Sequence, residues 1–263
     1  MQHYTRLPLL VVIKVLRYQV AALVAASIIG GGPWRFSAAA ATFTVEPTQI
    51  TLSGRTNSVL LTLRNESTEP LRFELSAFTW AQSPSGEMQL EPTEDVVFFP
   101  SLLTVGPGES RRVRVGSATS SEAREKSYRI FVEELPPANR QGGGVRVLTK
   151  MGIPIFVAPS KAVAAASLSS LDLQNGAVRF TLNNDGTVHF LPGDIRVKGF
   201  AGSAVTLEDQ VNGWYVLAGG RREFSVPLKA AQCSGITSLL VEIQFGSDLL
   251  QERLQTPNGV CPR

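Results

Sequence analysis

Few residues of this chain belong to the types that carry out covalent or metal chemistry. The 263-residue sequence contains two histidines, His3 and His189, and two cysteines, Cys233 and Cys261. Nucleophilic catalysis pairs a nucleophile with a base, and no nucleophile motif lies near His189, which follows a turn-forming Asn-Asp-Gly sequence. A zinc site needs more histidine and cysteine ligands than the chain offers. We therefore predict a protein that is not an enzyme and that holds no metal and no cofactor.

Two further motifs are weak candidates for chemistry. Glycines 142–144 lack both the lysine and the following helix of a phosphate-binding loop. Glu133 and Glu134 end an apolar strand pattern just before a Leu-Pro-Pro sequence. A solvated or capping role fits these carboxylates better than acid–base catalysis, because nothing else in the sequence marks a cleft there.

The first 41 residues have the pattern of an export signal. Arg6, Lys14 and Arg17 precede an apolar run over 20–29, and a row of alanines ends at Ala41. A membrane anchor is the alternative, but the apolar run is shorter than the roughly 20 residues that span a bilayer. We predict cleavage near Ala41 and a protein that is not integral to a membrane. The leader exceeds the usual length, which leaves open a start further downstream.

Both cysteines fall in the part of the chain that would be exported. An oxidising compartment favours a Cys233–Cys261 disulfide over two free thiols. Such a bond would contribute on the order of 3 kcal/mol to stability in the chain-entropy description. The formal net charge of +3 is mildly basic, but the basic residues are scattered and several lie in the leader, so nucleic acid is not an expected partner.

After the leader, strand patterns dominate and no long segment has helical periodicity. Alternating apolar residues, separated by Gly, Pro, Asn and Ser turns, predict an all-β protein of two immunoglobulin-like β-sandwiches in tandem, over 42–159 and 160–263. We read 162–166 as linker plus first strand of the second sandwich, because the run is too short for a stable helix. The other expected strands are 58–64, 71–80, 111–115, 128–135 and 145–159, then 178–182, 195–199, 214–217, 223–228 and 239–245.

The segment 145–159 alternates long enough to form one extended edge strand. A long apolar edge is an aggregation liability, so its presence indicates pairing with another protein. The alternative is that its apolar row belongs to the core of the first sandwich, which we expect for Ile153, Ile155 and Val157. Val145, Val147 and Met151 lie nearer the glycine-rich loop and are the preferred residues for contact with a partner.

Several of these segments together resemble the periplasmic chaperones of the chaperone–usher pilus pathway. The most specific part is the order of a Tyr-Arg pair at 128–129, Glu-Leu-Pro at 134–136 and Ile-Pro-Ile-Phe-Val at 153–157. The other matching segments are 43–47, 61–65, 106–109 and 214–222. The resemblance covers the chain from about Thr42 to its C-terminus.

The resemblance implies how such a protein would work in the periplasm. Its two immunoglobulin-like domains are set at an angle, and the last strand of the first domain completes pilus or fimbrial subunits that lack a strand of their own. The subunits are then delivered to an outer-membrane usher. The expected donor residues are Val145, Val147, Thr149, Met151 and Ile153. Whether the free protein forms a self-capping homodimer through the same edge stays open.

The chain departs from the family where the subunit's terminal carboxylate is anchored. The conventional anchor is an arginine in the first strand and a lysine in the last, and alignment places Gln49 and Pro154 at these positions. Charged donors hold a carboxylate more strongly than neutral ones, so other residues are expected to contribute. Lys150 is the first candidate, and Arg146 and Arg129 follow. Solvated strand charges are an equal alternative for them. The variation resembles the archaic-type branch of the family.

Two other functions remain open on the sequence alone. Tandem sandwiches with an export signal could form an extracytoplasmic adhesive or ligand-binding protein, because a fold does not fix a function. A pilus subunit is less consistent with the sequence, since Thr42 runs almost directly into strand residues without a free N-terminal extension.

Overall fold

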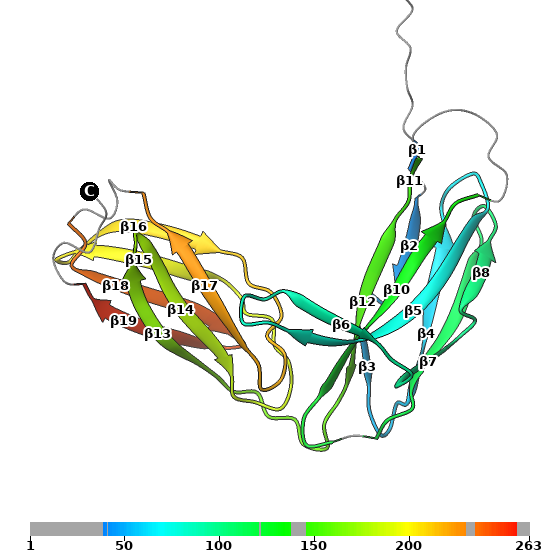
Figure 1. The fold of residues 1–263 in the computed structure, drawn as a ribbon, viewed down its shortest axis with the longest axis horizontal. Helices are drawn as coiled ribbons and strands as arrows, with labels where there is room; N and C mark the ends of the chain where they lie inside the picture. Colours follow the sequence, from blue (N-terminus) through cyan, green and yellow to red (C-terminus); the bar gives the residue numbers. More distant parts are fainter. Residues whose placement is uncertain (1–38, 41, 121, 138–145, 230–234, 257–263) are drawn as a thin grey trace, which may run out of the picture. The chain divides into compact units, whose positions relative to one another are not determined.

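The structure is a computed structural model that describes residues 39–40, 42–120, 122–137, 146–229 and 235–256 (Figure 1). The regular elements in these ranges are β-strands, which confirms the predicted all-β class. Across the same ranges, no helix has the length and apolarity needed to cross a membrane.

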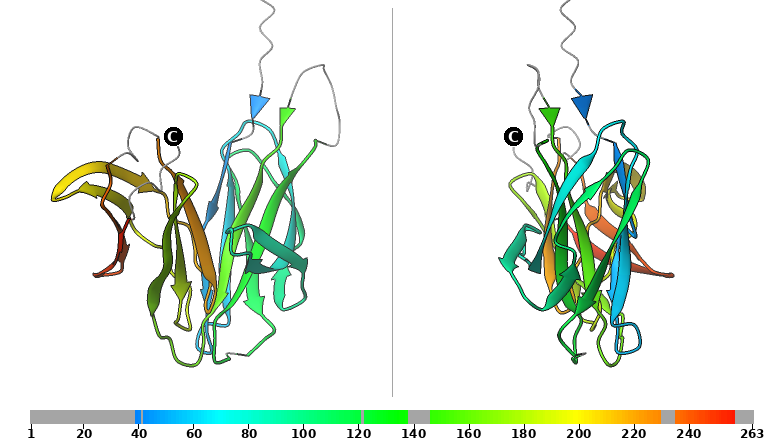
Figure 2. Two further views of the ribbon diagram at one scale, coloured as in Figure 1. Left: turned by 60° about the vertical axis from the view of Figure 1, so that its left-hand side comes forward. Right: turned by 90° about the vertical axis from the view of Figure 1, so that its right-hand side faces the viewer.

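The first β-sandwich is built from two sheets, and its layers are visible in Figure 2. One sheet has the order β2-β4-β9-β7, and the other has the order β3-β12-β10-β5-β6, with β8 also paired to β5. The strands are β2 (Phe43–Glu46), β3 (Ile50–Leu52), β4 (Ser58–Asn65), β5 (Leu71–Gln82), β6 (Met88–Pro92), β7 (Val96–Phe99), β8 (Leu102–Val105), β9 (Ser110–Ser117), β10 (Lys126–Leu135) and β12 (Lys150–Val157).

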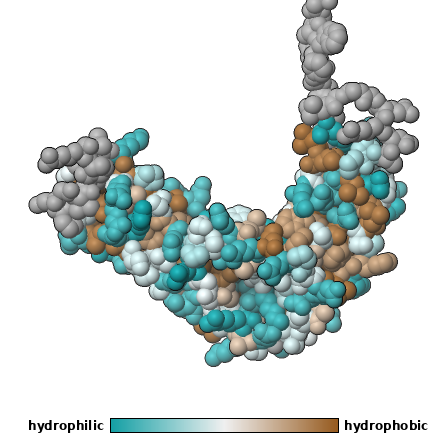
Figure 3. Space-filling view, viewed as in Figure 1, coloured by the Kyte–Doolittle hydropathy of each residue, from teal (hydrophilic) through white to brown (hydrophobic). Residues whose placement is uncertain are grey.

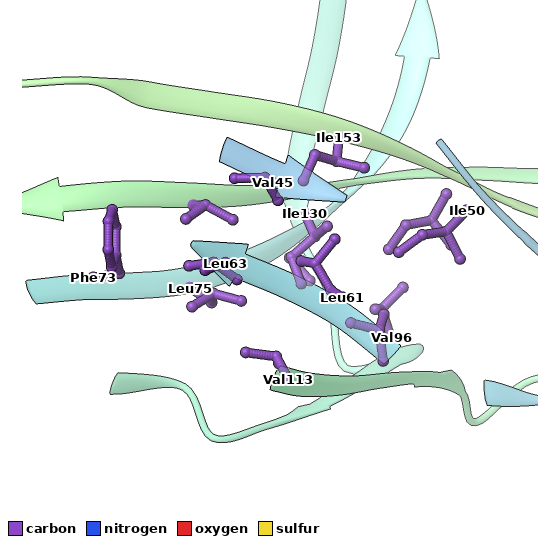
Figure 4. Packing of buried hydrophobic residues seen from close by; sticks show 14 of the residues in the cluster. Val45, Ile50, Leu61, Leu63, Phe73, Leu75, Val96, Val113, Ile130 and Ile153 are labelled. Atoms are coloured by element: carbon purple, nitrogen blue, oxygen red, sulfur yellow. The ribbon is translucent and has the colours of Figure 1, made fainter. Parts of the chain in front are cut away.

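The core of this sandwich follows from the two-residue period of its strands. Alternate residues of β5, including Phe73 and Leu75, point inward and are buried, as are Ile130 on β10 and Ile153 on β12. Figure 4 shows these side chains packed between the two layers with Leu61 and others from the facing sheet. The intervening residues of β5, β10 and β12 therefore lie on the outer face of the same sheet.

The second β-sandwich has a separate hydrophobic cluster, in which Phe180 and Phe224 stack with ring centroids 5.0 Å apart. Its sheets have the orders β13-β14-β17 and β16-β15-β18-β19. Figure 3 shows hydrophobic residues interspersed among hydrophilic ones on the surface in view. The strands are β13 (Ala166–Gln174), β14 (Ala177–Asn184), β15 (Ile195–Ala201), β16 (Ala204–Val211), β17 (Arg221–Pro227), β18 (Ser238–Phe245) and β19 (Asp248–Gln255).

The segment expected to form one edge strand over 145–159 is divided. It contains β11 (Arg146–Val147) and β12, with Leu148 and Thr149 outside any strand. β11 pairs in parallel with β1 (Ala39–Ala40) in a small sheet of its own. β12 pairs with β10 along its whole length, but over 155–157 it also pairs with β3 and is no edge there. The prediction of a single uncovered strand is therefore wrong for this last part, because β3 supplies a second neighbour that periodicity alone does not reveal.

The prediction of a strand over 214–217 is also wrong. Val216 forms only an isolated bridge with Phe190. Just before it, Gly213 lies against Pro192, where an added Cβ would meet the proline carbonyl oxygen at 2.7 Å. The sequence also did not predict β3, β6, β7, β8, β16 and β19. In β16 and β19 the alternation is masked by exposed polar residues.

Candidate functional site

The expected donor residues have different environments in the structure. Val147 is 52% exposed, and Thr149 is half-buried. Ile153 is buried in the first core, as are Ile155 and Val157. Met151 packs against that core although it was expected to face a partner. Val145 lies outside the described residues.

The backbone of β12 has an open side over its first part. Residues 150–154 pair with β10, and no strand in the described ranges pairs with their other side. Unpaired backbone N–H and C=O groups at such an edge can receive an additional strand. In the sequence, Val147 precedes this open part.

Lys150 has a carboxylate partner within the chain. Its Nζ lies 2.8 Å from Oε2 of Glu133, and both side chains are about half-exposed. The two residues face each other across β12 and β10. Lys150 thus forms a surface ion pair with Glu133, and its positive charge already has a partner within the chain. Arg146, another candidate, lies in β11 and has an interaction within the chain.

Arg129 has a different environment from the other candidates. It lies on the outer face of β10, directly opposite Pro154 of β12, the position at which the family resemblance places a lysine. Only 6% of its surface is exposed. Its Nη1 donates a hydrogen bond to the carbonyl oxygen of Gly152 at 3.2 Å. Gly152 allows the strand to pass Phe131, whose Cε1 would lie 2.8 Å from an added Cβ.

Aromatic rings lie beside the guanidinium of Arg129. Its Cζ is 4.1 Å from the ring centroid of Trp80 and 5.9 Å from that of Trp214. Trp80 also contacts Tyr215 in an edge-to-face arrangement with ring centroids 5.5 Å apart. The hydroxyl of Tyr215 donates to Oε1 of Gln49 at 3.0 Å. Gln49, at the position of the conventional arginine, therefore belongs to the surroundings of Arg129.

Three buried N–H donors in this region lack an acceptor. Nε and Nη2 of Arg129 and Nε1 of Trp80 have no hydrogen-bond partner in the part of the chain that the structure describes. Burial lowers the pKa of Arg129 from its ordinary value, and yet an arginine stays protonated at physiological pH. A buried cation with unused donors is suited to bind an anion. The guanidinium edge matches a carboxylate in particular, because it can donate two parallel hydrogen bonds.

His189 also lies in this region but is engaged. Its Nδ1 lies 2.7 Å from Oε1 of Glu125, and its ring stacks on Phe156 with centroids 3.5 Å apart. Within the described ranges no group of three or more His, Cys, Asp or Glu residues could hold a metal ion. The predicted Cys233–Cys261 disulfide lies outside the described residues.

The sequence did not single out Trp80 and Trp214 as site residues. Trp80 was assigned to a strand pattern without a role, and Trp214 to a strand that does not form. A signal was present nonetheless, because Trp80 and Arg129 both occupy outward positions in the alternation of their strands. The chain has only one other tryptophan, Trp34, which lies in the predicted leader.

The comparison with family models decides what kind of domain carries this site. Residues 42–163 match the model described as "Pili and flagellar-assembly chaperone, PapD N-terminal domain". The first sandwich therefore matches the N-terminal domain of pilus-assembly chaperones. The resemblance noted in the sequence is thus confirmed over the region that includes β12 and Arg129. A comparison with curated protein sequences gives no match.

Solved structures with the same fold include several of these chaperones. One is the pre-assembly complex of the chaperone CsuC with the tip subunit CsuE, from archaic Csu pili of Acinetobacter baumannii, with a TM-score of 0.55, 17% identity, and coverage of 81% of this chain and 97% of that one. The class 5 fimbriae chaperone CfaA has a TM-score of 0.54 and 15% identity, with 82% and 100% covered. The complex of the Salmonella enterica pilin SafA with the chaperone SafB has a TM-score of 0.53 and 11% identity, with 81% and 96% covered.

Proposed function

We propose that this chain is a periplasmic chaperone that holds pilus subunits by donor-strand complementation and delivers them to an outer-membrane usher. The observation that carries the proposal is the family match of residues 42–163, because it includes the strand whose outer edge is open over 150–154. An added subunit strand would satisfy the backbone groups of that edge. Apolar donor side chains would at the same time leave water, at about 25 cal/mol per Å².

The donor residues in this proposal are Val147 and the preceding Val145, with Thr149 as a weaker contact. Val147 has the exposure that a donor side chain needs before a subunit binds. Met151 and Ile153 would contribute mainly as the wall against which the added strand packs, since both contact the first core. The same edge could pair two free copies of the chain, which would be the self-capping homodimer.

Arg129 is the carboxylate anchor in this proposal. It is buried, it has two unused donors, and it faces Pro154, so the positive charge lies one strand away from the conventional lysine position. Gln49 is a neutral neighbour of the same site through Tyr215. Lys150 is a weaker candidate than Arg129, because Glu133 already neutralises its charge. The absence of charge at Gln49 and Pro154 also supports assignment to the archaic-type branch.

Copurification tests the donor strand. The tagged chain would be expressed in a periplasm together with candidate small secreted β-rich subunits, and the bound proteins would be identified by mass spectrometry. We expect a subunit in one-to-one ratio with the wild-type chain. Val147→Asp should abolish capture, because a charge buried under the added strand is unfavourable.

Val205→Asp is the matched control for this experiment. Val205 is 53% exposed on β16 of the second sandwich, against 52% for Val147. Equal loss of capture in both variants would point to a general effect of charge and would contradict the donor role. If no candidate subunit copurifies with the wild-type chain, the extracytoplasmic adhesive or ligand-binding function becomes the better explanation.

Export, processing and domain division are part of the same proposal. We propose a signal peptide over 1–41, a first domain over 42–159, a second over 160–263 and a Cys233–Cys261 disulfide. The intact mass of the periplasmic protein tests two of these points together. It should correspond to a chain that starts near Ala41, and it should rise by the mass of two alkyl groups only when reduction precedes alkylation.

A further inference from the structure

Arg129 is covered in the free chain, although a carboxylate anchor must meet another molecule. The residue is 6% exposed, and its Nε and Nη2 are among the fully buried side-chain atoms. An incoming carboxylate can reach these two donors only after a neighbouring group moves. The identity of that group determines how the site opens.

Trp80 and Tyr215, two of the aromatic residues around Arg129, are held in place. Trp80 is 3% exposed and packs in a cluster with Phe156 and Leu217. Tyr215 donates from its hydroxyl to Gln49, and its carbonyl oxygen accepts a hydrogen bond from Nε2 of Gln82 at 3.0 Å. Movement of either residue would break buried contacts or hydrogen bonds.

Trp214 is the neighbour that can move with the smallest loss of contacts. It is 43% exposed, and it lies between β16 and β17, outside any strand. Its ring contacts Tyr215 edge-to-face, with centroids 5.3 Å apart, and lies 5.9 Å from Cζ of Arg129. A cation–π contact at that distance is weak compared with the 4.1 Å contact to Trp80.

We propose that Trp214 is the cover of the Arg129 site. In the free chain its indole lies over the guanidinium, and rotation of the Trp214 side chain exposes Nε and Nη2 to a carboxylate. Trp80 stays in place, with its ring centroid 4.1 Å from Cζ of the guanidinium. The carboxylate then enters in the plane of the guanidinium, which is the geometry of two parallel hydrogen bonds. The identity of the ligand, a subunit's terminal carboxylate, rests on the proposed function, whereas the cover itself does not.

Chemical labelling of arginine tests the cover without any subunit. Phenylglyoxal reacts with accessible guanidinium groups, and digestion with mass spectrometry gives the rate of modification at each arginine. A covered state that opens only in a minor population should react slowly, and removal of the cover should raise the rate at Arg129 about tenfold or more. We expect this rise in Trp214→Ala and not in Trp214→Phe, which keeps an aromatic ring at the position.

Arg222 is an internal control in the same samples. It is a partly buried arginine on β17, 5.2 Å from Phe224, with Nε and Nη1 unpaired within the described part of the chain. Its labelling rate should not change in Trp214→Ala. An equal rise at both arginines would indicate general loosening of the fold and would overturn the assignment, as would equal rates at Arg129 in the wild-type chain and Trp214→Ala.

Protection by a carboxylate separates the cover from the function of the site. Sodium acetate, compared with sodium chloride at equal ionic strength, should slow the labelling of Arg129 in Trp214→Ala and leave Arg222 unaffected. Loss of this protection would contradict carboxylate binding at Arg129 while leaving the cover intact. Subunit capture, measured separately by copurification, then decides whether the exposed guanidinium serves the proposed chaperone function.

Discussion

Lys198 and Arg129 are both cations on outer sheet faces, but they differ in whether the chain supplies an acceptor for them. On the second sandwich, Nζ of Lys198 lies 2.6 Å from Oε2 of Glu242, and the two side chains are 23% and 13% exposed. On the first sandwich, Arg129 is more deeply buried and has aromatic rings and a carbonyl oxygen as neighbours. Lys198 thus has its acid in the same chain, while two donors of Arg129 have no acceptor among the described residues.

The difference indicates which cation serves the fold and which serves binding. Lys198 and Glu242 satisfy each other, and Gln251 donates a further hydrogen bond to Glu242. They belong to the wall of a cavity of about 530 Å³ whose charges are already paired, so the cavity offers little to an ionic ligand. An unsatisfied buried donor is a destabilising feature for the isolated chain. Its presence at Arg129 is consistent with an acceptor that arrives from another molecule.

Arg129→Met should have the largest effect on binding. Loss of the charged donors should weaken subunit capture about 100-fold, because hydrogen bonds to charged groups contribute about 1.5–3 kcal/mol each. The unfolding free energy of the free chain should stay equal or rise by about 1 kcal/mol, since two unsatisfied donors are removed and the long side chain still packs on Trp80. Affinity for the copurified subunit and urea denaturation measure the two effects. Unchanged affinity would exclude Arg129 as the anchor.

Phe78→Glu should give Arg129 an acid within the chain, as Glu242 does for Lys198. Phe78 lies directly opposite Arg129 across β5 and β10, so a carboxylate there could occupy the guanidinium from within the chain. We expect capture to fall about tenfold, as the subunit must then compete with an internal acid, at about 1.4 kcal/mol per factor of ten. Phe78→Gln is the control, because it loses the same contact between Phe78 and Phe131 without adding charge. Equal capture by the two variants would show that the internal carboxylate does not reach Arg129.

The sequence predicted much of the framework but only part of the site. The alternation of apolar residues located β4, β5, β9 and β10 and indicated two successive sets of strands. It could do so because side chains in a strand point to the core at every second residue. It could not reveal that β3 covers the end of β12, or that Lys150 meets Glu133, since these contacts depend on the pairing of strands that are distant in sequence. Arg129 was a second choice for the same reason. Its burial and its position opposite Pro154 follow from strand register, which no local pattern specifies.

Lys198→Met should affect stability and leave binding unchanged. Glu242 would keep its hydrogen bond from Gln251 but lose its cation, and a partly buried carboxylate without a counter-charge is unfavourable. We expect the unfolding free energy to fall by about 1 kcal/mol, between the values of surface and fully buried pairs. Subunit capture should match the wild-type chain. A loss of capture as large as that of Arg129→Met would contradict the division between a folding pair and a binding cation.

The smallest expected effect is a difference in acid sensitivity between the two regions. The hydrogen bond from Lys198 lowers the pKa of Glu242 from its ordinary value near 4.5, against the opposing effect of burial. A carboxyl group whose pKa is lower in the folded chain stabilises the fold above its unfolded pKa, and this contribution is lost as the pH falls through the folded value. Denaturation between pH 5 and pH 3 should therefore show a shallower loss of stability in Glu242→Gln than in the wild-type chain. Arg129 does not titrate in that range, so Arg129→Met should keep the wild-type slope. If Glu242→Gln also kept that slope, the Lys198–Glu242 pair would contribute no measurable stability, and the contrast with Arg129 would rest on binding alone.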